Sequence, residues 1–273
     1  MQLNGGWLVG ARRVPSPHHD CRPDDENPSL LVVHNISLPP GEFGGPWIDA
    51  LFTGTLDADA HPYFAGIAHL RVSAHCLIRR DGEIVQYVPF DKRAWHAGVS
   101  SYHGRERCND FSIGIELENR GWQKSAGSKY FAPFEPAQIQ ALIPLAKDII
   151  ARYDIKPQNV VAHADIAPQR KDDPGPLFPW QALAAQGIGA WPDAQRVAFY
   201  LAGRAPHTPV ETASLLDLLS RYGYEVKPEM TPREQQRVIM AFQMHFRPQL
   251  WNGVADVETM AIAEALLEKY GQG

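Results

Sequence analysis

Two histidines and an aspartate stand out as side chains that could bind a metal ion. His34 follows the apolar run 30–33, and Asp173 comes ten residues after His163. The segment 163–176 also contains Lys171 and three prolines. Because proline fixes its φ angle, such a loop can hold side chains in place without a helix or strand. Two imidazoles and one carboxylate suit a catalytic zinc ion, which keeps its fourth position for water.

Spacing alone leaves a second interpretation open. The chain has 11 histidines, and a lone histidine at a strand end is more often a hydrogen-bonded structural residue than a ligand. A His-x9-Asp spacing is not one of the short metal-binding motifs. From spacing, both interpretations therefore stand.

Composition restricts the class of protein. A length of 273 residues predicts one large domain or two smaller ones. The net charge of −5 argues against a general nucleic-acid binder, which usually presents a basic face. No apolar stretch approaches the ~20 residues of a membrane-spanning helix, so we expect no membrane span.

The N-terminus and the cysteines suggest a compartment. The first residues lack a basic segment followed by an apolar core, so they do not read as a secretory signal. The three cysteines, Cys21, Cys76 and Cys108, favour free thiols in a reducing compartment. We therefore expect a cytoplasmic protein, or a periplasmic or outer-membrane one if the N-terminus has been replaced.

The first part of the chain predicts an α/β domain with a mixed sheet flanked by helices. Strands are expected at 30–34 and 112–118, and a hairpin at 76–88 turns on Asp81-Gly82. The region between 34 and 75 is rich in Pro and Gly and reads as a long loop on the rim of a cleft. A helix with Pro144 inside its pattern starts near 136, and a short strand at 159–162 leads to His163.

The end of the chain predicts a small three-helix domain. Capping boxes are expected at 208–211 and 231–234. In each, Thr is at the N-cap, Pro is at the first helical position, and Glu follows Thr by three residues. Asp256 is expected to cap a third helix that ends at Gly271. We therefore predict domains at 1–190 and 191–273.

Four segments together resemble a known family. Residues 31–35, 94–98, 112–116 and 163–176 are similar, in this order, to the zinc-dependent N-acetylmuramoyl-L-alanine amidases of the peptidoglycan recognition protein superfamily. The resemblance implies zinc-dependent hydrolysis of the amide between (anhydro-)N-acetylmuramic acid and L-alanine of peptidoglycan stem peptides, in cell-wall degradation or recycling. It also implies one Zn²⁺ ion held by His34, His163 and Asp173.

The resemblance assigns two further catalytic roles. Glu116 is the expected general base, because its apolar strand neighbours reduce its hydration and suit it to proton transfer near neutral pH. Glu118 is a rival on the same strand face. Lys171 is expected to reach the developing oxyanion from its place two residues before Asp173. A strand-edge ion pair and a solvated surface lysine are the alternatives.

Other residues are expected to contact the substrate. Arginines could bind the carboxylates of the stem peptide in bidentate fashion. The expected substrate-binding residues are Asn35, Arg71, His75, Trp95, His96, Arg107 and Arg170.

The resemblance differs along the chain. Residues 1–117 are most similar to the AmpD type of amidase, and residues 118–273 to the AmiD type with its helical C-terminal domain. We therefore predict a chimera of the two, with a peptidoglycan-binding-like domain at 191–273 and muropeptides or peptidoglycan fragments as partners of a monomer.

Three alternatives remain at this point. The first is a non-catalytic peptidoglycan-binding protein on the same fold. The second is a zinc peptidase that cleaves within the stem peptide, although no HExxH motif is present. The third is a poorly assembled, weakly active fusion.

Overall fold

The computed structural model describes residues 1–271, which fall into two compact units. Unit 1 comprises residues 1–98 and 108–156, and unit 2 comprises residues 99–107 and the chain from 157 onward. The domain boundary expected near residue 190 is not decided by this division and stays a prediction.

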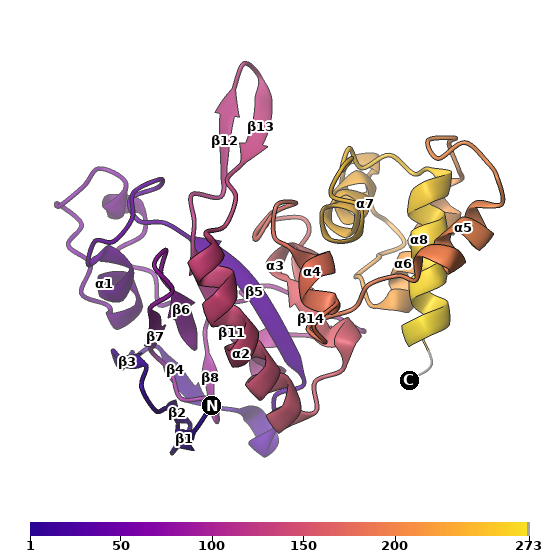
Figure 1. Ribbon diagram of the computed structural model, residues 1–273. Coiled ribbons are helices and arrows are strands. Elements are labelled where there is room, and N and C mark those ends of the chain that lie inside the picture. Colours follow the sequence, from indigo (N-terminus) through magenta and orange to yellow (C-terminus); the bar gives the residue numbers. More distant parts are fainter. Residues whose placement is uncertain (272–273) are drawn as a thin grey trace. The chain divides into compact units, whose positions relative to one another are not determined.

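Unit 1 is built on a mixed β-sheet (Figure 1). Within its described residues, the strands follow the order β5-β11-β6-β7-β3, with β5, β11 and β6 parallel and β6 antiparallel to β7. These strands are β3 (Arg12–Arg13), β5 (Leu30–Ile36), β6 (Cys76–Ile78), β7 (Ile84–Gln86) and β11 (Ser112–Glu118). The expected strands and the expected hairpin are confirmed, and Gly82 takes the positive φ of 90° that its turn requires.

Burial explains why the two longest strands lie side by side. Every residue of β11 is buried, as are the first five of β5. A parallel strand covered on both faces reads as a continuous apolar run, as residues 30–33 of β5 do. In β11, apolar residues alternate with a serine, a glycine and two glutamates, although every position is buried. The register of the two strands places Glu116 directly opposite His34.

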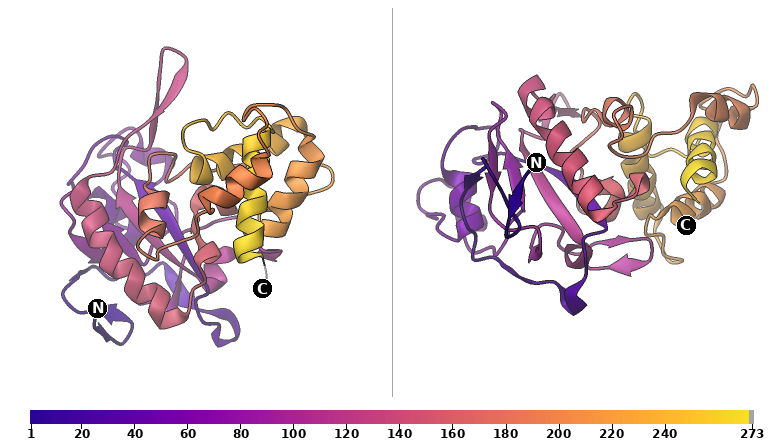
Figure 2. Two further views of the ribbon diagram at one scale, coloured as in Figure 1. Left: turned by 45° about the vertical axis from the view of Figure 1, so that its right-hand side comes forward. Right: turned by 60° about the horizontal axis from the view of Figure 1, so that its bottom comes forward.

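Two helices pack on this sheet within unit 1. Helix α2 (Pro136–Tyr153) runs along one face of the sheet, and its Gln138 side chain donates to the backbone oxygens of Ile78 and Glu118 (Figures 1 and 2). Helix α1 (Trp47–Thr53) contributes Ile48, Leu51 and Phe52 to the core formed with β6 and β7. The region expected to be a long loop therefore contains a helix as well.

Short two-stranded sheets complete unit 1. Most of them are too short to carry a periodic pattern that a sequence reading could detect. They are formed by β1 (Leu3–Asn4) with β2 (Trp7–Leu8), β4 (His19–Cys21) with β8 (Lys92–Ala94), and β12 (Trp122–Ser125) with β13 (Ser128–Phe131).

Unit 2 is mainly helical. The expected short strand before His163 is confirmed as β14 (Val160–Ala162). It leads directly into a short helix, α3 (His163–Ile166), so the segment expected to be a loop without a helix begins with a helical turn whose first residue is His163. The other elements of unit 2 are β9 (Ser101–Tyr102), β10 (Arg105–Glu106), α4 (Trp180–Ala184), α5 (Ala194–Leu201), α6 (Thr212–Tyr222), α7 (Pro232–Phe246) and α8 (Val257–Tyr270). The helices α6, α7 and α8 confirm the expected helical segment, and the orange α5 precedes them (Figure 1).

One expected cap is wrong and two are confirmed. Helix α6 begins at Thr212 and not at Pro209, because Pro209 forms a β-bridge with Asp256 and Val210 donates its N–H to the backbone of Ala255. Backbone pairing has displaced the capping box there. Thr231 caps α7 and Asp256 caps α8 as expected.

The described residues bear on two further expectations, the lack of a membrane span and the state of the cysteines. None of the helices within residues 1–271 is both long enough and apolar enough to cross a membrane. The three cysteines are free thiols in this part of the chain.

Candidate metal centre and active site

In unit 1, the strands β5 and β11 fix the orientation of His34. Its imidazole is nearly buried, and its Nε2 lies 2.8 Å from Nδ1 of His96. The Nε2 of His96 in turn lies 2.9 Å from the hydroxyl oxygen of Ser112. The second ring nitrogen of His34, Nδ1, lies 3.9 Å from Oε1 of Glu116. The nitrogen that faces Glu116 is thus the one not bonded to His96.

The two glutamates of β11 have different surroundings. Glu118 accepts hydrogen bonds from the guanidinium of Arg79 at 3.2 Å and from the backbone N–H of Gly44 at 2.8 Å. The carboxylate of Glu118 therefore has a structural role: it links β11 to Arg79 and to the backbone of Gly44. Glu116 lies beside His34 because the strand register makes them partners.

A glycine in the middle of β11 makes room for the His96 ring. A Cβ atom at Gly114 would lie 2.5 Å from Cγ of His96, closer than real Cβ contacts come. No side chain can therefore be accommodated at position 114 unless the imidazole moves.

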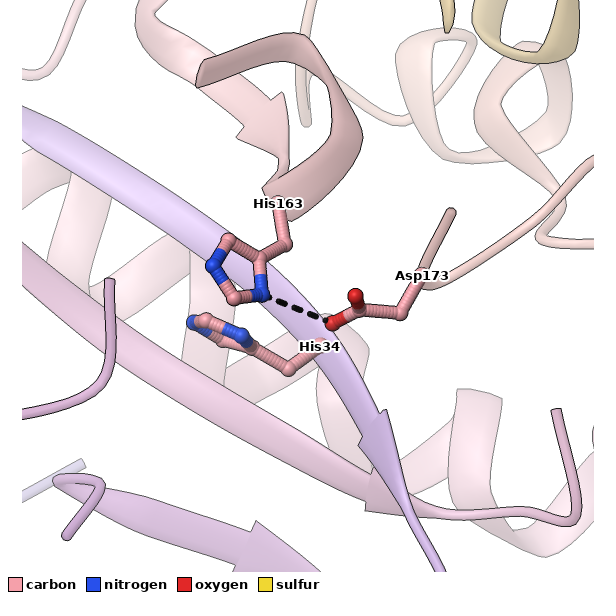
Figure 3. Close-up of side chains that lie close together, drawn as sticks. All are labelled: His34, His163 and Asp173. Atoms are coloured by element: carbon pink, nitrogen blue, oxygen red, sulfur yellow. Dashed lines mark hydrogen bonds and ion pairs between the residues drawn. The ribbon is translucent and has the colours of Figure 1, made fainter. Parts of the chain in front are cut away.

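In unit 2, His163 and Asp173 lie next to each other. Nδ1 of His163 is 3.1 Å from Oδ2 of Asp173, and both side chains are largely buried (Figure 3). The backbone N–H of Ala164 donates to the backbone oxygen of Asp173 at 3.0 Å, which closes the base of the intervening segment. We call residues 163–173 the ligand loop. Lys171, on this loop, is half-buried.

Asn35, Trp95 and His96 are half-buried in unit 1. His96 bonds to His34, which gives it a structural partner that sequence reasoning did not foresee. The indole N–H of Trp95 donates to Asp20. Contact of these residues with substrate stays a prediction.

His75 lies entirely inside unit 1. Its Nδ1 accepts from the backbone N–H of Gly114, and its Nε2 lies 2.9 Å from the backbone oxygen of Lys92. Burial, with a smaller contribution from the nearby Arg22 charge, lowers the pKa of His75 to about 3. The imidazole is neutral at physiological pH, and this placement lends no support to its expected contact with substrate.

The three expected arginines are all exposed. Arg71 lies in unit 1, and Arg107 and Arg170 lie in unit 2. Arg170 donates to the backbone oxygen of Val99 at 2.7 Å. Exposure leaves these side chains accessible to a ligand, and their roles stay predictions.

Sequence reasoning missed the residues that hold the others in place. Ser112 supports His96, and Asp165 and Arg237 bond within or to the ligand loop. Their types and spacing follow no motif, and the long-range partners of Asp165 and Arg237 lie 59 or more residues away in the sequence.

Comparison with known proteins places the chain in a family. Residues 24–176 match the Amidase_2 family, described as N-acetylmuramoyl-L-alanine amidase. The N-acetylmuramoyl-L-alanine amidase AmiD of Escherichia coli (strain K12) is 77% identical over 215 residues, covering 76% of this chain and 78% of AmiD. The 1,6-anhydro-N-acetylmuramyl-L-alanine amidase AmpD of Citrobacter freundii is 71% identical over 185 residues, covering 68% of this chain and 94% of AmpD.

A solved structure agrees over nearly the whole chain. It is AmiD from E. coli in complex with the substrate anhydro-N-acetylmuramic acid-L-Ala-D-gamma-Glu-L-Lys, with a TM-score of 0.77 and 62% sequence identity. The similarity covers 98% of this chain and 94% of that one. This chain therefore belongs to the N-acetylmuramoyl-L-alanine amidase family of enzymes.

Proposed function

We propose that this enzyme hydrolyses the amide between (anhydro-)N-acetylmuramic acid and L-alanine with one zinc ion bound by His34, His163 and Asp173. The observation that carries the proposal is the proximity of these side chains. Each offers one ligand atom, and these atoms lie within 4.8 Å of one another (Figure 3).

The donor set fits zinc. Two imidazoles and one carboxylate leave a coordination position open, as catalytic zinc sites do. Because Nε2 of His34 lies 2.8 Å from Nδ1 of His96, we assign Nδ1 of His34 as its ligand atom. The proton of His34 then sits on Nε2 and is donated to Nδ1 of His96, and His96 donates its own Nε2 proton to Ser112.

The chemistry divides between the ion and the chain. When bound, zinc supplies Lewis acidity, which polarises the amide carbonyl and makes water a better nucleophile near neutral pH. Glu116 accepts the proton of the attacking water and returns it to the leaving nitrogen of L-alanine. Lys171 stabilises negative charge on the former carbonyl oxygen with its ammonium group.

The substrate class is supported by the solved relative. AmiD from E. coli was solved with an anhydro-muramoyl tripeptide as its substrate. We propose that this chain accepts the same class of molecule, and that the exposed Arg71, Arg107 and Arg170 bind carboxylates of the stem peptide.

The test is release of stem peptide from a purified anhydro-muropeptide, followed by mass spectrometry with and without a zinc chelator. We expect chelator-sensitive release of a peptide that begins with L-alanine. Asp173→Ala should abolish the release, because it removes a ligand, whereas the exposed Asp59→Ala should retain it.

Two outcomes would contradict the proposal. Release that resists the chelator would exclude zinc as the cofactor. Cleavage inside the peptide, which leaves L-alanine on the sugar, would indicate a peptidase.

Several expectations stay predictions. They are the compartment, the monomeric state, peptidoglycan binding by residues 191–273, and a chimeric origin with a junction near residue 118.

A further inference from the structure

An arginine on α7 holds the ligand loop at several points. The guanidinium of Arg237 donates from Nε to the backbone oxygen of Pro168 at 2.8 Å and from Nη2 to that of Lys171 at 3.0 Å. Its Nη1 forms an ion pair with Asp172 at 2.9 Å. A planar guanidinium with several donors is suited to such a fork, which a single ammonium cannot reproduce.

A second residue of α7 holds the start of the same loop. The carboxylate of Asp165 accepts from Nδ1 of His245 at 2.7 Å, from the hydroxyl of Tyr224 at 2.6 Å and from the backbone N–H of Ala162 at 2.7 Å. Asp165 and His245 are both buried. This cluster fixes the turn of chain that begins with His163.

The contacts come from one side of α7. A third link joins the Gln169 side chain to the backbone oxygen of Glu234 at 3.0 Å. At about 100° per residue, positions 234, 237 and 245 fall within roughly 80° of the helix circumference. One helix face therefore touches the ligand loop near its start, its middle and its end.

We propose that α7 positions His163 and Asp173 for zinc, with Arg237 as the main positioning residue. The inference rests on the zinc site proposed above. The loop between the two ligands has little regular structure after α3, so its shape depends on these side-chain bonds. Asp172 and the carbonyl of Lys171 adjoin Asp173, so their bonds to Arg237 fix the backbone from which that ligand projects.

The experiment compares two arginines of one helix. Arg237→Gln removes the ion pair and most of the fork, and Arg233→Gln is the matched control because Arg233 is exposed on the same helix. We would measure the zinc dissociation constant by competition with a chromogenic chelator, and amide hydrogen exchange of residues 167–172 in the zinc-free protein. Thermal unfolding of both variants checks the fold.

We expect Arg237→Gln to weaken zinc binding about 10–100-fold, the usual effect of losing a residue that orients a ligand. The loop amides should exchange faster in the zinc-free variant, and Arg233→Gln should match the wild type in both measurements. Arg237→Lys, which keeps the charge but not the fork, should fall in between.

Equal zinc affinity in the Arg237→Gln and Arg233→Gln variants would overturn the inference. If Arg237→Gln does not fold, the Arg237→Lys variant serves as the test. Zinc affinity equal to that of the wild type in Arg237→Lys would then overturn the inference. A wild-type protein that binds no zinc contradicts the proposed function instead, and in that case the exchange rates still test whether Arg237 orders the loop.

Discussion

The proposed zinc ligands are held in two different ways. In unit 1, His34 lies on β5, where strand register and the His96 ring fix it. In unit 2, His163 and Asp173 lie on a loop whose shape depends on side chains from α7 and on Tyr224.

The difference shows two routes to an ordered site. A strand position is set by a ladder of backbone hydrogen bonds, so the site residue needs only one or two side-chain partners. A loop position lacks that ladder and needs a fork such as Arg237. Substitutions in unit 1 should therefore act through the ligand's immediate partner, and those in unit 2 through the loop backbone.

The largest expected effect separates the two glutamates of β11. Glu116→Gln should lower kcat by about 10²–10⁴-fold, because it removes the proposed general base. Zinc content should stay unchanged, as measured by elemental analysis. Glu118→Gln should instead lower the free energy of unfolding by about 1–3 kcal/mol, because it weakens the bond to Arg79. If the Glu116→Gln variant instead lost its zinc, Glu116 would be a metal ligand and not the general base.

A smaller effect is expected at His96. His96→Leu removes the partner of His34 and should weaken zinc binding about 10–100-fold in the chelator assay. His96→Asn keeps a polar atom near the position of Nδ1 and should recover part of this loss. In the double variant His96→Leu with Arg237→Gln, the two losses of zinc-binding free energy should add, because the two residues act on different ligands. Strong non-additivity would mean that the two ways of holding ligands are not independent.

The effect that is smallest at neutral pH concerns His75, a buried histidine of unit 1 that bonds to the backbone. Its lowered pKa means that, between about pH 6.5 and about pH 3, the unfolded chain binds a proton that the folded chain does not. This contribution to the free energy of unfolding is fully present above the unfolded pKa and is lost as the pH falls toward the folded pKa, by at most ~1.4 kcal/mol per pH unit. Denaturant titrations should find a steeper acid dependence in the wild type than in His75→Gln. Equal slopes would contradict the burial argument.

The sequence predicted the parts that regular patterns encode. Buried strands and the Asp81-Gly82 turn follow local rules, so β5, β11 and the hairpin were predicted correctly. The proposed ligands could be named because four segments resemble a family. That resemblance supplied roles that spacing alone left open.

What could not be predicted depends on contacts between distant residues. The start of α6 was misplaced because Pro209 pairs with Asp256, a partner that no local pattern reveals. The roles of His96 and Arg237 were missed for the same reason. Each is fixed by a partner more than 60 residues away in the sequence.

Gly114 has a consequence for how related sequences should vary. The His96 ring occupies the space that a side chain at 114 would fill, so the two positions form one steric unit. We expect them to covary: a chain with alanine at 114 should carry a smaller residue at 96 and should orient its strand histidine through a different partner. A mid-strand glycine can thus serve as a marker of ligand orientation when homologous sequences are compared.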